Sequence, residues 1–86
     1  MQTITPANMN IKLFGITREI IGEEQLTITD KNIRTVAELK TWLFSAYPSI
    51  RQLSSLAVAV NHTYAEDADP VGPDHEIALI PPVSGG

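Results

Sequence analysis

A short apolar run, two prolines and two glycines follow one another at the end of the sequence, in Ile77-Ala78-Leu79-Ile80-Pro81-Pro82-Val83-Ser84-Gly85-Gly86. Residues 77–80 are apolar at every position, which is typical of a strand that is covered on both faces in the middle of a sheet. Pro81 and Pro82 have no backbone N–H, so they cannot extend a hydrogen-bonded ladder. The sequence therefore predicts a central strand over 76–80 and an extended tail over 81–86.

Alternating apolar and polar residues predict two more strands near the start of the chain. Residues 9–13 alternate and are followed by Gly15, and residues 24–29 alternate in the same way. Residues 18–22 can form one helical turn that closes at Gly22. Because so few residues separate the two strands, we expect them to form a hairpin. Residues 1–8 show no period and are interpreted as a loose N-terminal extension.

The clearest helix signal begins at Thr35. Thr35 and Glu38 have the spacing of a capping box, in which each side chain accepts a hydrogen bond from the other residue's backbone N–H. Pro48 disfavours helical geometry at the preceding residue, so the helix should end there. Residues 49–55 are interpreted as a short turn. A helical wheel places four apolar side chains on one face, namely Val36, Leu39, Leu43 and Ala46.

The second half of the chain predicts one more strand, over 56–61, then a polar segment over 62–75 and the final strand. Two strands, a helix and two further strands in 86 residues predict an α+β domain with one sheet and one covering helix. The compact solution is the β-grasp, or ubiquitin-like, arrangement, with a mixed sheet of about four to five strands. Its first and last strands would lie parallel and side by side. The domain would span 9–80.

Composition excludes several classes of function. The chain has 86 residues, a net charge of −4 and no cysteine, so no disulfide, thiolate metal site or cysteine nucleophile is possible. All six basic residues lie in the first 51 positions, and the last 35 carry five acidic residues and no basic one. A basic footprint for nucleic acid is absent. No apolar run is long enough to span a bilayer, and no secretory signal is visible, so we expect a soluble, cytoplasmic protein.

No catalytic or metal-binding constellation is visible. His62 and His75 have no third ligand at a usable spacing, and zinc requires three or four ligands. The aspartates at 67, 69 and 74 lack the glycine and glutamate of a calcium loop. None of the serines lies in a nucleophile elbow. We therefore expect no permanently bound metal or cofactor and no enzymatic activity of the chain alone.

The tail has features that fit one another. Two prolines favour a stiff polyproline II segment that directs the chain away from the domain. The four residues after them reach about 13 Å when extended, and Gly85 and Gly86 leave the tip without side chains, so it can enter a narrow channel. A carboxylate at this tip becomes an acyl donor once ATP adenylates it. The competing interpretation is a frayed end without a role.

The ending Ile80-Pro81-Pro82-Val83-Ser84-Gly85-Gly86 resembles the C-terminus of the small, sulfur-carrying subunits of molybdopterin synthases. Three further stretches share the resemblance: Ile11-Lys12-Leu13-Phe14 with Arg18-Glu19 and Gly22, Val58-Ala59-Val60-Asn61, and Asp74-His75-Glu76-Ile77-Ala78. It covers about residues 9–86. The sequence departs from the family at Gly72-Pro73-Asp74-His75 and in the loop before it, and neither departure touches the tail.

The resemblance implies a β-grasp fold and a sulfur-transfer function. A partner activating enzyme would adenylate Gly86, which would then become a thiocarboxylate; both modifications would be transient. The tail residues 81–85 (Pro81, Pro82, Val83, Ser84 and Gly85) would insert into the large catalytic subunit of a heterotetrameric synthase. There the sulfur would pass to cyclic pyranopterin monophosphate in molybdenum cofactor biosynthesis.

Strand parity makes Phe14 and Ile80 candidates for an apolar docking patch. The acidic second half of the chain would suit basic partners. Three alternatives remain open from the sequence: a sulfur carrier for thiamine thiazole synthesis, a ubiquitin-like modifier of protein lysines, and an interaction domain whose tail is inert.

Overall fold

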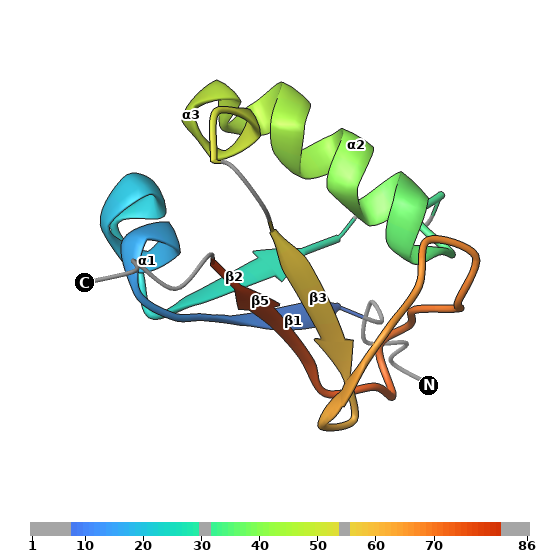
Figure 1. Cartoon of the computed structure of the whole chain (residues 1–86). Coiled ribbons are helices and arrows are strands. Elements are labelled where there is room, and N and C mark those ends of the chain that lie inside the picture. The colour runs from blue at the N-terminus through green and yellow to red at the C-terminus, as the bar shows by residue number, and fades with distance from the viewer. Residues whose placement is uncertain (1–7, 30–31, 54–55, 82–86) are drawn as a thin grey trace, which may run out of the picture.

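A five-stranded sheet, covered on one face by a single long helix, makes up most of the computed structural model (Figure 1), which describes residues 8–29, 32–53 and 56–81. Two shorter helices precede and follow the long helix in the chain. The elements are, in chain order, β1 (Met9–Leu13), α1 (Ile16–Ile21), β2 (Gln25–Ile28), α2 (Val36–Ala46), α3 (Pro48–Arg51), β3 (Ala57–Val60), β4 (Thr63–Tyr64) and β5 (Ile77–Ile80).

The strands lie in the order β2-β1-β5-β3-β4, so the last strand in sequence is central in space. β1 and β5 are parallel neighbours, with Ile11 opposite Ile77. β1 and β2 form the expected antiparallel hairpin, and β3 pairs antiparallel with β5. The α+β, β-grasp prediction is confirmed, with a mixed sheet of five strands.

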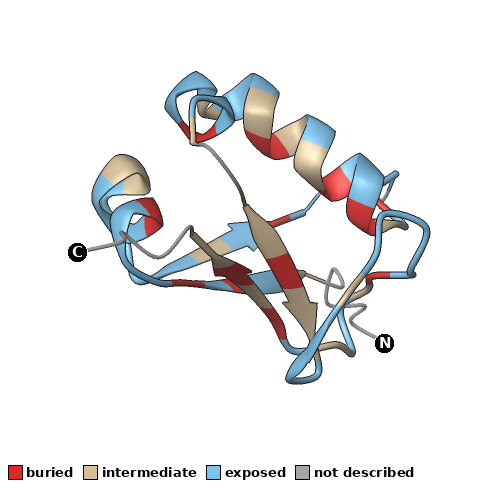
Figure 2. Ribbon diagram, viewed as in Figure 1, coloured by how far each residue is buried: buried red, intermediate tan, exposed pale blue. Residues whose placement is uncertain are grey.

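The core lies between the sheet and α2. Figure 2 shows the buried positions of α2 on the side of the helix that faces the sheet. Val36, Leu39 and Leu43 are completely buried, as the helical spacing predicts. Ala46, which the helical spacing places on the same face, is exposed, because it is the last residue of the helix. Past this end the chain turns into α3, whose Ile50 supplies a buried side chain.

Two elements in the second half differ from the sequence prediction. Part of the turn expected over 49–55 is the helix α3, in which Pro48 is the first residue. Proline favours this position because the N–H it lacks would have no partner there and its φ is already helical. Pro48 therefore both ends α2 and begins α3.

β4 is the second difference, because it lies in the segment that was expected to be an irregular loop. Asn61 and His62 both have positive φ, 52° and 70°, which is the backbone of a two-residue hairpin turn. The turn brings Thr63 and Tyr64 back along β3, where Tyr64 is opposite Ala59. Asn-Gly is the strong sequence signal for such a turn, and Asn-His lacks the glycine.

The long segment after β4 is anchored on the start of α2. The capping box of Thr35 and Glu38 is present. The next backbone N–H groups of the helix are satisfied from outside it: Val36 N–H donates to the carbonyl of Asp69. Ala37 N–H donates to the carbonyl of Asp67 in the same way. A helix start leaves such groups without partners inside the helix, so this contact stabilises both the helix and the loop.

Candidate functional site

The root of the tail leaves the sheet from its central strand. Ile80 ends β5, and Pro81, which follows it, is partly buried. The predicted sulfur-carrying residue Gly86 and the predicted inserted residues 82–85 lie outside the described residues, so their roles stay predictions. Figure 1 shows that β5 ends on the same side of the sheet as α1. The tail root thus lies beside the turn that joins β1 to α1.

Gly15 forms the contact between that turn and Pro81. A Cβ placed on Gly15 would be 3.0 Å from Cγ of Pro81, and Gly15 has a φ of +56°. Both facts favour glycine, because a side chain would crowd the proline ring and this φ is rarely adopted by other residues. The proline that starts the tail therefore lies directly against the backbone of the β1–α1 turn.

The face of the sheet opposite α2 carries a cross-strand row of four side chains with two alanines at its centre. Cross-strand register aligns Lys12, Ala78, Ala59 and Tyr64 over four neighbouring strands. Successive residues of a strand point to opposite faces, so these four side chains lie on the face opposite the core residues. Because two alanines occupy the centre of the row, the face is hollowed there.

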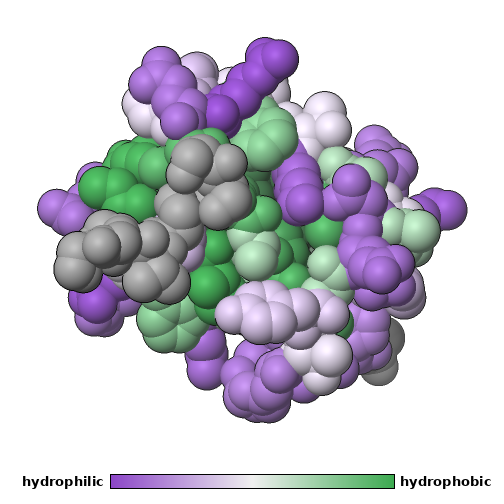
Figure 3. Space-filling model, viewed as in Figure 1, coloured by the Kyte–Doolittle hydropathy of each residue, from purple (hydrophilic) through white to green (hydrophobic). Residues whose placement is uncertain are grey.

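Larger side chains surround the two alanines. A hollow of about 410 Å³ is lined by Lys12, Phe14, Ala59, His62, Tyr64, Glu76, Ala78 and Ile80. Phe14 and Ile80, which the sequence proposed as a docking patch, therefore line one surface feature. We call it the outer-face hollow. The space-filling view in Figure 3 shows hydrophobic surface over the sheet with hydrophilic residues around it.

Tyr64 also lines the outer-face hollow, and the sequence did not predict it as a site residue. Among the described residues the exposed large hydrophobic side chains are Phe14, Ile16 and Tyr64, with Tyr64 72% exposed. Two of the three line the outer-face hollow. Exposed apolar groups gathered in this way mark interaction surfaces. The missing signal was the Asn61–His62 turn: once it is recognised, strand pairing places Tyr64 beside Ala59.

One side of the outer-face hollow is polar. A carboxylate oxygen of Glu76 lies 3.4 Å from Nζ of Lys12 and 3.2 Å from Nε2 of His62. All three side chains are well exposed, so these pairs add little to folding stability. Charged groups at the rim of an interface instead orient the partner and speed its approach. The hollow thus combines an apolar floor with a polar margin, as protein-protein interfaces do.

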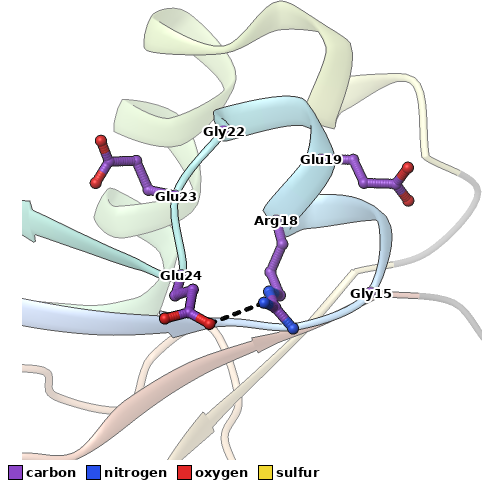
Figure 4. Close-up of a pocket in the computed structure, with 6 residues that line it drawn as sticks. All are labelled: Gly15, Arg18, Glu19, Gly22, Glu23 and Glu24. Carbon is purple, nitrogen blue, oxygen red and sulfur yellow. Dashed lines mark hydrogen bonds and ion pairs between the residues drawn. The ribbon is translucent and has the colours of Figure 1, made fainter.

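A second depression lies at α1, close to the tail root (Figure 4). It is lined by Gly15, Arg18, Glu19, Gly22, Glu23 and Glu24. Arg18 is engaged in an ion pair with Glu24 at 2.9 Å, while Glu19 and Glu23 point away from it into solvent. Among the described residues, the lining therefore has no hydroxyl, thiol or imidazole group, and its one cation is paired with Glu24.

The described part of the chain offers neither a metal site nor a membrane-spanning helix. In residues 8–29, 32–53 and 56–81, no three His, Cys, Asp or Glu side chains are arranged to hold a metal ion. No helix in this part of the chain is long and apolar enough to cross a membrane. His62 lines the outer-face hollow, and His75 lines a separate depression together with Asp69 and Pro70. The structure does not bring the two histidines together as ligands.

A β-grasp domain with an apolar outer-face hollow and a tail that leaves its central strand defines a ubiquitin-like protein. Comparison with known proteins agrees. The model of the ThiS family matches residues 11–86. The molybdopterin synthase sulfur carrier subunit of Arabidopsis thaliana is 33% identical over 79 residues, which cover 91% of this chain and 82% of that protein. The chain therefore belongs to the ThiS family, and its resemblance to molybdopterin synthase sulfur carrier subunits is confirmed.

Solved structures give the same fold. SAMP1, a small archaeal modifier protein from Haloferax volcanii, superposes with a TM-score of 0.74 at 26% identity, covering 92% of this chain and 99% of the other. A complex of subunits 1 and 2 of the molybdopterin-converting factor from Helicobacter pylori contains a chain with a TM-score of 0.61, also at 26% identity. That match covers 92% of this chain and 99% of the other.

Proposed function

We propose that this chain is the sulfur carrier subunit of a molybdopterin synthase and carries its sulfur on the carboxyl group of Gly86. One observation carries the proposal. The family match spans residues 11–86 and so includes the whole tail, in a chain 33% identical to a sulfur carrier subunit. With no cysteine in the sequence, the terminal carboxyl is the most plausible seat for a covalently carried sulfur.

The chemistry needs two steps at that carboxyl. The carboxylate oxygen attacks the α-phosphorus of ATP, pyrophosphate leaves, and an acyl-adenylate forms. A sulfide-level sulfur donor then attacks the acyl carbon and expels AMP, which leaves a thiocarboxylate. The two glycines at the tip add no side-chain bulk, so the reacting group can enter a narrow channel in a partner. The sulfur then passes to cyclic pyranopterin monophosphate, and hydrolysis returns the acyl carbon of Gly86 to a carboxylate.

The catalytic groups would belong to the partners, so the chain would be the sulfur-donating subunit rather than an enzyme by itself. Two partners are required: an adenylating enzyme and the large synthase subunit. The Helicobacter pylori complex, in which subunit 1 is bound to subunit 2 of the converting factor, supports the second. The outer-face hollow, with Phe14, Tyr64 and Ile80, is the surface that would meet them.

Mass spectrometry of the intact chain and its fragments tests the proposal. The chain is incubated with ATP, an adenylating enzyme and a sulfur donor, and we expect one oxygen to be replaced by sulfur at Gly86. Oxidation of Met1 or Met9 adds nearly the same mass, so fragmentation must locate the change. If Gly86 stays a plain carboxylate while the enzyme modifies a reference carrier, the proposal is wrong.

The similarity to SAMP1 favours one further candidate, a protein modifier. In that case the activated carboxyl of Gly86 would acylate the Nζ of a lysine on another protein. Cell extracts would then contain higher-mass conjugates that react with an antibody to this chain and that disappear when Gly86 is deleted. A dedicated sulfur carrier forms almost none of these conjugates.

A further inference from the structure

Thr17 has an unusual environment. It is the buried polar residue of the described part of the chain, with no exposed surface. Its hydroxyl donates to the carbonyl of Phe14 at 2.5 Å and accepts from the N–H of Phe14 at 3.1 Å. The backbone N–H of Thr17 donates to the same carbonyl at 3.2 Å. One side chain therefore satisfies both backbone groups of Phe14.

The turn that Thr17 holds, residues 14–17, contacts both the outer-face hollow and the tail root. Phe14 lines the outer-face hollow. Gly15, the next residue, lies against the ring of Pro81, the described residue from which the tail continues. Residues 14–17 thus connect Phe14, at the outer-face hollow, to the root of the tail. The hydroxyl of Thr17 is the side-chain group that fixes this connection.

We propose that Thr17 is a positioning residue that sets the direction of the tail relative to the outer-face hollow. The proposal rests on the proposed function, since it requires that the tail work inside a docked partner. Without the hydroxyl, the N–H of Phe14 loses its hydrogen-bond partner, and a polar group left unpaired in a partly buried site is costly enough to shift the turn.

A small shift at the tail root would be amplified at the tip of an extended tail. If residues 81–86 were fully extended they would span about 20 Å, and a rotation of roughly 10° at the root would then displace the tip by about 3.5 Å. Misplacing a reacting group by about 1 Å can slow a reaction about a hundredfold. Thr17 therefore acts on the reaction from a distance, through the position of Phe14 and Pro81, without touching the reacting atoms.

The test compares Thr17→Val, which keeps the shape but removes the hydroxyl, with Thr17→Ser, which keeps the hydroxyl. Thr41→Val is the matched control: the Thr41 hydroxyl also donates to a backbone carbonyl, that of Ala37, but on the exposed side of α2. Two readouts are used. One is the nuclear Overhauser contact between Gly15 Hα and the ring protons of Pro81. The other is kcat and KM for ATP–pyrophosphate exchange by the adenylating enzyme.

We expect Thr17→Val to weaken the Gly15–Pro81 contact and to lower kcat about tenfold or more. Thr17→Ser and Thr41→Val should stay within about twofold of the unsubstituted chain. The proposal is overturned if folded Thr17→Val keeps the contact and the kinetics, or if Thr17→Ser is equally impaired. Should Thr17→Val not fold, Thr17→Ala replaces it, because it removes the hydroxyl and adds no apolar group.

The two proposals fail in different ways. If the unsubstituted chain supports no ATP–pyrophosphate exchange with an enzyme that activates a reference carrier, the proposed function is wrong. The Gly15–Pro81 contact still decides whether Thr17 positions the turn, because it is measured on the chain alone. Loss of kcat in Thr17→Val with an unchanged Gly15–Pro81 contact also counts against Thr17 acting through the tail root.

Discussion

The two faces of the sheet are built from alternate residues of the same strands, yet one face is buried and the other is exposed to solvent. On the face toward α2, Ile11, Ile77 and Leu79 are buried to 0% exposure and pack into one aliphatic core. On the other face, the neighbouring Lys12 and Ala78 line a hollow that is open to solvent. The inner face supplies folding stability through apolar burial, while the outer face leaves apolar surface uncovered, which we propose is covered by a partner. Substitutions on the two faces should therefore affect different measurements.

The largest effect on folding is expected on the inner face. Leu39 is fully buried in α2, so Leu39→Ala removes apolar contacts and leaves a cavity, which should lower the free energy of unfolding by about 3 kcal/mol. Urea denaturation measures this change. Ser45→Ala, at an exposed position of the same helix, is the control and should stay within about 0.5 kcal/mol. A loss below about 1 kcal/mol for Leu39→Ala would contradict the described core.

The outer face should show the opposite result. Phe14→Ala and Tyr64→Ala should each weaken binding to the large synthase subunit about tenfold, because aromatic side chains at interface centres carry much of the binding energy. The free energy of unfolding should change by less than about 1 kcal/mol, since both side chains are exposed. Titration calorimetry and urea denaturation provide the two values.

Ile16 provides the matched control for that prediction. It is 40% exposed, similar to Phe14 at 46%, but does not line the outer-face hollow. Ile16→Ala should therefore leave partner affinity within about threefold of the unsubstituted chain, well short of a tenfold change. Equal losses for Ile16→Ala and Phe14→Ala would show that general apolar exposure, and not the hollow, drives binding.

A smaller effect is expected at the start of α2, the helix that covers the inner face. The Thr35 hydroxyl accepts from the N–H of Glu38, so Thr35→Ala should cost about 1 kcal/mol of the free energy of unfolding. Thr35→Ser keeps the accepting oxygen and should recover most of the loss. Thermal denaturation of both variants checks this. Equal melting temperatures for Thr35→Ala and the unsubstituted chain would show that the capping box does not stabilise the fold.

The smallest effect is expected at the polar margin of the outer face. Glu76→Gln removes the charge that pairs with Lys12, and exposed ion pairs contribute about 0–1 kcal/mol. Stability should hardly change, while the association rate with the partner should become less sensitive to salt. Stopped-flow association at two ionic strengths measures this. An unchanged salt dependence would mean that this margin does not face the partner.

Local patterns were sufficient for most elements of the fold. Residues 9–13 alternate, and the alternation fixes which side chains of β1 enter the core, because successive residues of a strand point to opposite faces. Thr35 and Glu38 locate the helix start because the capping box is a contact between near neighbours in sequence. β4 was not found, because its pairing with β3 depends on a turn whose Asn61–His62 pair is a weak signal.

The sequence by itself determined the β-grasp fold, the family, and the predicted chemistry of a tail that ends in two glycines, because alternation, capping and terminal motifs are local properties of the chain. Only the tertiary structure decided that Tyr64 joins Phe14 and Ile80 around two central alanines. It also decided that Thr17 and Gly15 connect this surface to Pro81. Phe14 and Ile80, like Gly15 and Pro81, are far apart in the chain, and the parallel register of β1 and β5 brings them together. The hydrogen bonds of Thr17 to Phe14 are local, and the fold connects them to the tail root through Gly15.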